Sequence, residues 1–171
     1  MISKLICGII LAEDCEIERV DELLTDKFGP IDFRSNAFPF NLTSYYEKEM
    51  GTRLSRKWIS FENLILAEEL KIIKRTTIEI ESMFKRTNYT RKVNLDPGYL
   101  TLSNLVLAST KNYYHRIYLG DTIYAEVTLI YKNNRFHNLD WTYPDYRANM
   151  NIFEEIRNTF SAQLKKRTEN P

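Results

Sequence analysis

The stretch KLICGIILA at residues 4–12 decides the fold. It is a continuous apolar run bounded by charge, which is typical of a central β-strand buried on both faces. Apolar side chains at helical spacing follow over residues 14–28, and a Gly-Pro pair predicts the end of that helix. A second strand is predicted over 56–62, and the clearest helix over 66–85.

Two further extended segments complete this pattern, one over residues 31–40 and one over residues 92–95. We expect the second to end at the turn Asp96-Pro97-Gly98. The order strand–helix–strand–strand–helix–strand over residues 4–96 matches the ferredoxin-like split βαβ arrangement.

The C-terminal half predicts a short helix at 103–109, a hairpin of strands 113–119 and 122–131, and an amphipathic last helix. We therefore predict an α+β fold: a ferredoxin-like split βαβ core with an added C-terminal β-hairpin and helix, and a mostly antiparallel sheet. The 171 residues are expected to form a single globular domain, residues 1–171, with a frayed tail at about 166–171.

Composition narrows the class of protein. With 24 basic and 23 acidic residues the net charge is +1, so strong attraction to nucleic acid or to an anionic membrane is not indicated. Cys7 and Cys15 form no metal-ligand pattern and no disulfide framework. The N-terminal apolar run is too short to span a bilayer and lacks a convincing cleavage site, so we expect a cytoplasmic protein.

The hairpin carries the main candidate site. If Gly120-Asp121 is a two-residue turn, His115 lies opposite Glu126. An imidazole held by a carboxylate is suited to general acid–base catalysis, whereas the simpler alternative is a structural cross-strand pair. In this register Arg116 lies on the opposite face from His115. A slip of one residue would separate the His–Glu pair.

Further residues complete the predicted site. Asp96 ends a strand, which is one way to present a catalytic carboxylate, although Asp-Pro-Gly also favours a turn by itself. Ser109-Thr110-Lys111 supplies hydroxyls and an amine for an anion, or else only a helix cap and a solvated lysine. The predicted catalytic residues are His115, Glu126 and Asp96, and the predicted ligand-binding residues are Lys111, Arg116, Tyr124, Tyr99 and Thr128.

Several site classes find no support in the sequence. It contains no GxxxxGK[ST] phosphate loop and no GxGxxG after a strand. Two separated histidines without cysteine partners do not make a zinc site, so no metal ligand is assigned, although carboxylate-bound Mg²⁺ needs no compact motif. The sequence leaves the cofactor unknown.

Long segments of the chain resemble an uncharacterised prokaryotic family, a domain of unknown function. They are FGPIDFRSNAFPFNLTSYYEKEMG (28–51), KWISFENL (57–64), VNLDPGYLTLSNLVLASTKNYYHRIYLGDTIYAEVTL (93–129) and WTYPDYR (141–147). The resemblance covers nearly the whole chain and implies one cytoplasmic domain. It brings no established activity and no catalytic residues.

The leading hypothesis is a domain that binds or acts on a nucleotide-like or phosphorylated small molecule. Lys111 and Arg116 would hold the anion, His115 with Glu126 would move protons, and Tyr124 would stack or hydrogen-bond. The alternatives are an RNA-binding sheet and a non-catalytic protein-interaction module. A deep pocket that gathers His115, Glu126 and Asp96 would favour the first hypothesis, and exposed tyrosines on an open basic sheet would favour RNA.

Overall fold

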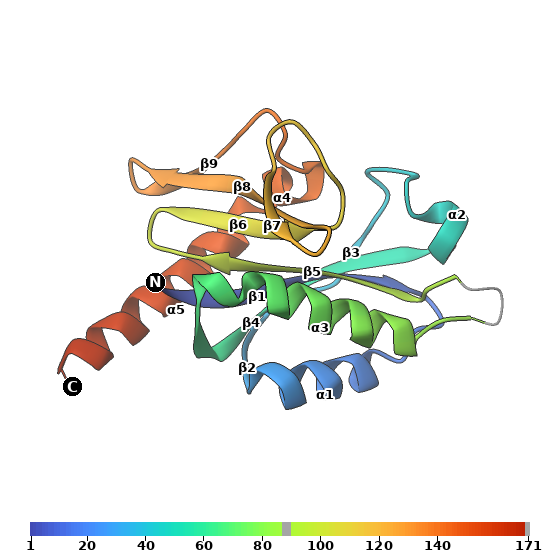
Figure 1. The fold of residues 1–171 in the computed structure, drawn as a ribbon, viewed down its shortest axis with the longest axis horizontal. Helices are drawn as coiled ribbons and strands as arrows, with labels where there is room; N and C mark the ends of the chain where they lie inside the picture. The colour runs from blue at the N-terminus through green and yellow to red at the C-terminus, as the bar shows by residue number, and fades with distance from the viewer. Residues whose placement is uncertain (87–89, 170–171) are drawn as a thin grey trace.

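The computed structural model, which describes residues 1–86 and 90–169, is an α+β protein built on one sheet of nine strands (Figure 1). The strand order is β2-β4-β1-β5-β6-β8-β7, with β3 paired to β4 and β9 paired to β8, and all of these pairings are antiparallel. The strands are β1 Ile2–Ala12, β2 Ile31–Arg34, β3 Phe38–Pro39, β4 Leu54–Leu66, β5 Val93–Leu100, β6 Asn104–Ser109, β7 Ile117–Gly120, β8 Ile123–Lys132 and β9 Arg135–Asn138. The helices are α1 Ile17–Phe28, α2 Glu47–Met50, α3 Leu70–Met83 after a short 3₁₀ turn, α4 Pro144–Ala148 and α5 Met150–Glu169.

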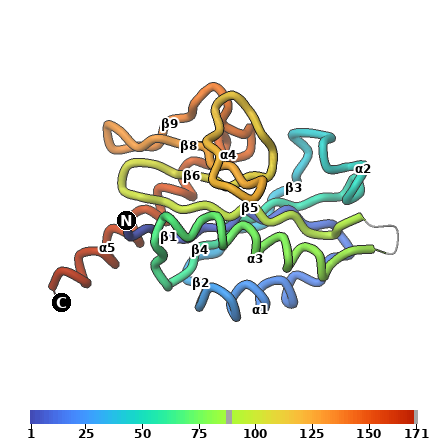
Figure 2. Tube along the Cα trace, in the orientation of Figure 1, coloured from blue at the N-terminus to red at the C-terminus, as the bar shows by residue number. Residues whose placement is uncertain are grey.

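Strand β1 is central, as its apolar run predicts, because each of its faces packs against a different layer. Leu5 and Ile9 point into a core shared with α1 and α3, whereas Ile6 points into a core shared with α5. Figure 2 shows the trace leaving this half of the molecule after β5 and building the second half from β6–β9. The α+β class, the mostly antiparallel sheet and the helices α1 and α3 are confirmed.

Strand β5 does not end at Asp96-Pro97-Gly98, so the predicted turn is wrong. The strand continues to Leu100, and Cys7 of β1 pairs with Pro97. Proline is tolerated because β6 pairs with β5 only from Gly98 onward, and the missing Pro97 N–H faces the side where no strand is paired.

Two side chains of α3 take the place of β6 along that unpaired edge. Glu81 accepts a hydrogen bond from the Leu95 N–H at 2.6 Å, and Lys74 donates one to the Leu95 carbonyl at 2.6 Å. At Gly98, where β6 does pair, an added Cβ would meet the Val106 carbonyl oxygen at 2.4 Å. Glycine thus permits the close approach, and upstream of it β5 and β6 separate.

The predicted helix at 103–109 is also wrong, because residues Asn104–Ser109 form strand β6. A short apolar run such as LVLA fits a helix or a doubly buried strand equally well by periodicity. Its position between β5 and β8, with four consecutive buried residues, selects the strand.

The hairpin is shifted by one residue from the predicted register. The turn is Asp121-Thr122, both with positive φ (53° and 61°), as a tight primed turn requires. Tyr118 therefore pairs with Tyr124, and β7 is limited to Ile117–Gly120. Residues 113–116 lie outside the strand, which changes where His115 and Arg116 point.

The C-terminal helix α5 continues through Glu169, so residues 166–169 of the tail are helical, and the last two residues lie outside the described part. None of the helices among the described residues has the length and apolar character needed to cross a membrane.

Candidate functional site

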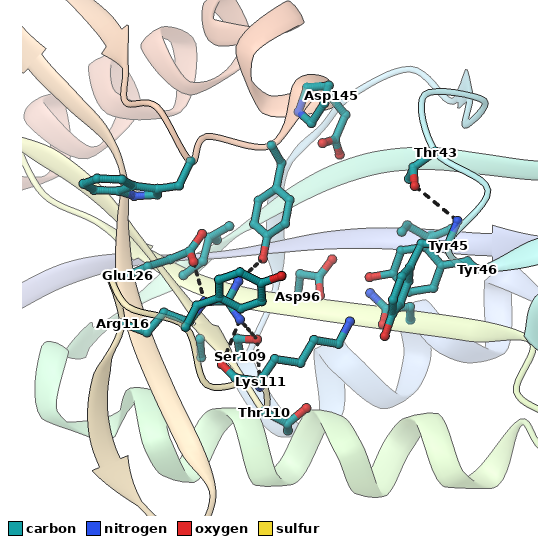
Figure 3. Close-up of a pocket in the computed structure, with 18 of the residues that line it drawn as sticks. Thr43, Tyr45, Tyr46, Asp96, Ser109, Thr110, Lys111, Arg116, Glu126 and Asp145 are labelled. Atoms are coloured by element: carbon teal, nitrogen blue, oxygen red, sulfur yellow. Dashed lines mark hydrogen bonds and ion pairs between the residues drawn. The ribbon is translucent and has the colours of Figure 1, made fainter.

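A pocket of about 850 Å³ opens where β5 and β6 separate (Figure 3). Its floor is formed by residues of β5 and β6, and its sides by the 40–46 segment, the 109–116 segment and residues 143–145. Five cationic side chains and four carboxylates line it: Lys74, Arg56, Arg91, Lys111 and Arg116, with Glu81, Asp96, Glu126 and Asp145. The volume lies in the range of small-molecule sites.

Arg56 of β4 is the centre of a buried ion-pair network. Its side chain is 4% exposed; its Nε donates to Asp145 Oδ2 at 2.7 Å, and its Nη1 donates to Asp96 Oδ2 at 3.1 Å. The guanidinium also lies 5.1 Å from the ring centroids of both Trp58 and Tyr146. Arg56 thus connects β4, β5 and α4 beneath the pocket.

Asp96 is held in its ionised form. Burial alone would raise the pKa of this carboxyl, but Arg56 and then Lys74 hold its pKa below its usual value. Its side chain is still 24% exposed and lines the pocket. It is therefore suited to accept hydrogen bonds from a ligand rather than to donate a proton.

Arg116 is the centre of a second network on the other side of the pocket. Its Nε donates to Glu126 Oε2 at 2.6 Å, and Nη1 donates to Ser109 Oγ at 3.0 Å and to the Lys111 carbonyl at 2.8 Å. Nη2 donates to the Tyr143 hydroxyl at 2.6 Å. The Arg116 side chain is 5% exposed and that of Glu126 is 1% exposed.

His115 contacts the same carboxylate, with Nε2 2.9 Å from Glu126 Oε2. Its ring stacks on Trp141 at 4.8 Å and 10°, and Trp141 is fixed by a hydrogen bond from its Nε1 to the Val127 carbonyl at 2.8 Å. The Nδ1 atom of His115 has no hydrogen-bond partner within the described chain. If Nε2 carries the proton, Nδ1 has an unused lone pair, although the atom itself is buried in this structure.

Lys111 reaches across the pocket to the 40–46 segment. Its Nζ lies 3.7 Å from the ring centroid of Tyr45, and Tyr45 packs edge-on against Tyr46 at 5.0 Å. Within residues 1–86 and 90–169 no carboxylate pairs with this ammonium. It is thus a cation that is free to meet an anionic ligand.

Five of the eight predicted site residues line the pocket: His115, Glu126, Asp96, Lys111 and Arg116. Arg116 joins His115 on one carboxylate, contrary to the register that placed it on the other face, because residues 113–116 leave the strand. Three predicted residues lie outside the lining. Tyr124 packs on Tyr118 at 5.1 Å, Tyr99 packs among apolar residues on the α3 side, and Thr128 donates weakly to Glu126 Oε1 at 3.4 Å.

Sequence reasoning missed Arg56 altogether. A signal for its burial was present in the sequence. Side chains alternate between the two faces of a strand, and Arg56 falls on the same face of β4 as Trp58 and Ser60, which are buried. The segment TYPDYR at 142–147 is anchored to the fold, because Tyr146 and Asp145 are buried in α4.

The chain belongs to a family of unknown function. The family model described as Domain of unknown function (DUF4416) matches residues 2–160. No curated protein matches the chain, and no solved structure matches it. In the described part of the chain, no group of three or more His, Cys, Asp or Glu side chains is placed to hold a metal ion.

Proposed function

We propose that the pocket binds a nucleotide-like or phosphorylated small molecule. The proposal rests on one observation: the Lys111 ammonium, which no carboxylate pairs in the described residues, lines the same pocket of about 850 Å³ as His115, Glu126 and Asp96. Lys111 would attract the anionic group, and the exposed ring of Tyr45 would contact a planar or sugar moiety. Asp96 would accept hydrogen bonds from hydroxyl or amino groups.

The His115–Glu126 pair gives this pocket a candidate proton-transfer group. Glu126 orients the imidazole through Nε2, and Trp141 holds the ring plane. Nδ1 is buried with an unused lone pair, which would accept a substrate proton only where ligand binding exposes this atom. This arrangement supports an enzyme that acts on the bound molecule. The reaction that follows depends on the ligand.

A thermal-shift screen of nucleotides, sugar phosphates and divalent metals tests the proposal. A ligand present at one hundred times its Kd stabilises a protein by about 2.7 kcal/mol, which for this size corresponds to a rise in Tm of about 5–10 °C. The shift should shrink in His115→Ala and Lys111→Ala. The matched controls His137→Ala and Lys132→Ala lie outside the pocket and should keep it. No shift by any phosphorylated compound in the wild type would refute the proposal.

RNA binding is the second candidate, supported by one observation. Tyr113 and Tyr114, which line the pocket, and Tyr118, which lies outside its lining, are all exposed and available for base stacking. A Tyr118→Ala variant, which leaves the pocket lining unchanged, would favour this candidate over the pocket if it loses binding of a single-stranded RNA while keeping small-molecule binding.

We further infer a ferredoxin-like split βαβ core over β1–β5, within a single domain. The antiparallel order β2-β4-β1-β5, with α1 and α3 on one face, supports this description, and β6–β9 with α5 would be additions to it. The free thiols of Cys7 and Cys15 support a cytoplasmic location.

A further inference from the structure

We propose that the hydroxyls of Ser109 and Tyr143, both hydrogen-bonded to Arg116, form with Lys111 a subsite for a phosphate monoester. This inference rests on the proposed function and specifies which residues recognise the anionic group. Arg116 itself is a positioning residue: it holds the two hydroxyls through hydrogen bonds and does not contact the phosphate.

The hydrogen-bond directions support this division of roles. Ser109 Oγ accepts two hydrogen bonds, one from Arg116 Nη1 at 3.0 Å and one from the Lys111 backbone N–H at 3.2 Å. A hydroxyl oxygen has two lone pairs and one proton, so Ser109 must donate that proton elsewhere. Among the described residues no acceptor takes the Ser109 hydroxyl proton. Because Ser109 lines the pocket, that proton is available to a bound ligand.

Tyr143 has the same arrangement on the other terminal nitrogen of the guanidinium. Its hydroxyl oxygen accepts from Arg116 Nη2 at 2.6 Å, and no described residue takes its proton. Burial, together with the nearby Glu126 carboxylate, raises the pKa of Tyr143 above its usual value, so the phenol stays protonated and acts as a donor.

Arg116 is well placed to hold both hydroxyls but poorly placed to bind the anion directly. Four hydrogen bonds already use its Nε and both terminal nitrogens, and Glu126 offsets its charge at the Nε end. Its positive charge polarises both O–H groups, which makes them stronger donors toward an anion.

The number and direction of the donors favour phosphate over carboxylate. Two O–H groups and one ammonium come from two segments of the chain, 109–111 and Tyr143, and three donors suit the three terminal oxygens of a phosphate monoester better than a planar carboxylate. Asp96, a carboxylate of the other network that also lines the pocket, is offset by Arg56.

The test compares matched ligands in the wild type and in the Ser109→Ala/Tyr143→Phe variant by isothermal titration calorimetry. The ligands are ribose 5-phosphate against ribose, and adenosine monophosphate against adenosine, with ribonate as the carboxylate probe. We expect the variant to bind both phosphate esters at least about tenfold more weakly than the wild type, since each lost bond to a charged group has roughly that weight. The affinity for the uncharged partners should stay the same.

A Tyr118→Phe variant, which removes a phenol hydroxyl outside the pocket, is the matched control and should bind like the wild type. Unchanged phosphate-ester affinity in the double variant, or equal weakening of charged and uncharged ligands, would overturn the subsite while leaving the proposed function intact. Tighter binding of ribonate than of ribose 5-phosphate would likewise overturn it. If no phosphate ester binds the wild type, both the subsite and the proposed function fail. Should the double variant not fold, Ser109→Ala and Tyr143→Phe are measured singly, each with an expected loss of about tenfold.

Discussion

Two buried arginines line one pocket, and their hydrogen-bond donors are satisfied in different ways. Arg56 donates to two carboxylates, Asp96 and Asp145, and has aromatic rings on its faces. Arg116 donates to one carboxylate, Glu126, and otherwise to neutral oxygens, including two hydroxyls. Both guanidinium groups are almost fully buried, so exposure does not distinguish them.

The difference shows how a buried cation can serve structure or recognition. Carboxylates that accept from Arg56 have no proton to pass on, so that network mainly ties β4, β5 and α4 together. Hydroxyls that accept from Arg116 still have a proton to donate, so the second network extends its hydrogen bonding into the pocket. Removal of each arginine should therefore have a different main consequence.

The largest effect is expected for Arg56→Met. Two carboxylates would lose their cation inside the fold, and we expect the free energy of unfolding to fall by about 3–5 kcal/mol. Urea denaturation measures this loss. The control Arg53→Met removes an arginine whose side chain is 80% exposed and paired with Glu13, and should cost at most about 1 kcal/mol. Equal losses in the two variants would contradict the structural role of Arg56.

Arg116→Met should destabilise the protein less, by about 2–3 kcal/mol, because Glu126 keeps its contact with His115. The main loss should instead appear in ligand binding, since Ser109 and Tyr143 would no longer be held. Denaturation and calorimetry on the same variant separate the two effects. A variant that loses stability as Arg56→Met does while binding ribose 5-phosphate normally would remove the distinction between the two arginines.

The pH dependence of protein stability tests the ion pair between Asp96 and Arg56. The pKa of Asp96 is lower in the folded than in the unfolded protein, so the folded state binds fewer protons and stability rises with pH across that interval. The contribution is present above the unfolded-state value of about 3.9 and is lost as the pH falls through the folded value. Asp96→Asn should lower stability at pH 7 by about 1.5 kcal/mol, from the loss of a charged hydrogen bond. The variant should also lose part of the decrease in urea midpoint that the wild type shows between pH 7 and about pH 2.5. An unchanged decrease in the variant would contradict this assignment.

The smallest effect is expected for Thr128→Val. Thr128 is buried and donates to Glu126 at 3.4 Å, a long hydrogen bond whose loss should cost about 0.5–1 kcal/mol. Thr128 lies outside the pocket lining, so its replacement touches no ligand contact directly. Ligand affinity should therefore stay within about twofold of the wild type. A larger loss of affinity would place Thr128 in the site, as the sequence predicted.

The sequence predicted the elements that carry their own pattern. The apolar run of β1 and the amphipathic helices α1 and α3 are visible from local periodicity, and the His115–Glu126 contact also exists in the structure. The predicted register does not produce this contact. The turn is one residue later than predicted, and His115 reaches Glu126 from outside β7. Pro97 and the LVLA run of β6 were misassigned, since their conformation depends on which strands lie beside them.

By itself, then, the sequence determined the α+β class, the buried first strand and the segment that contains most of the candidate residues. Local periodicity and turn chemistry suffice for these, because they depend on neighbours a few residues away. Only the tertiary structure decided that β5 and β6 separate into a pocket, and that Arg56 and Tyr143 line it. Arg56 is distant from the hairpin in sequence, and it reaches the same pocket only because the pairing of strands across the sheet brings β4 close to it.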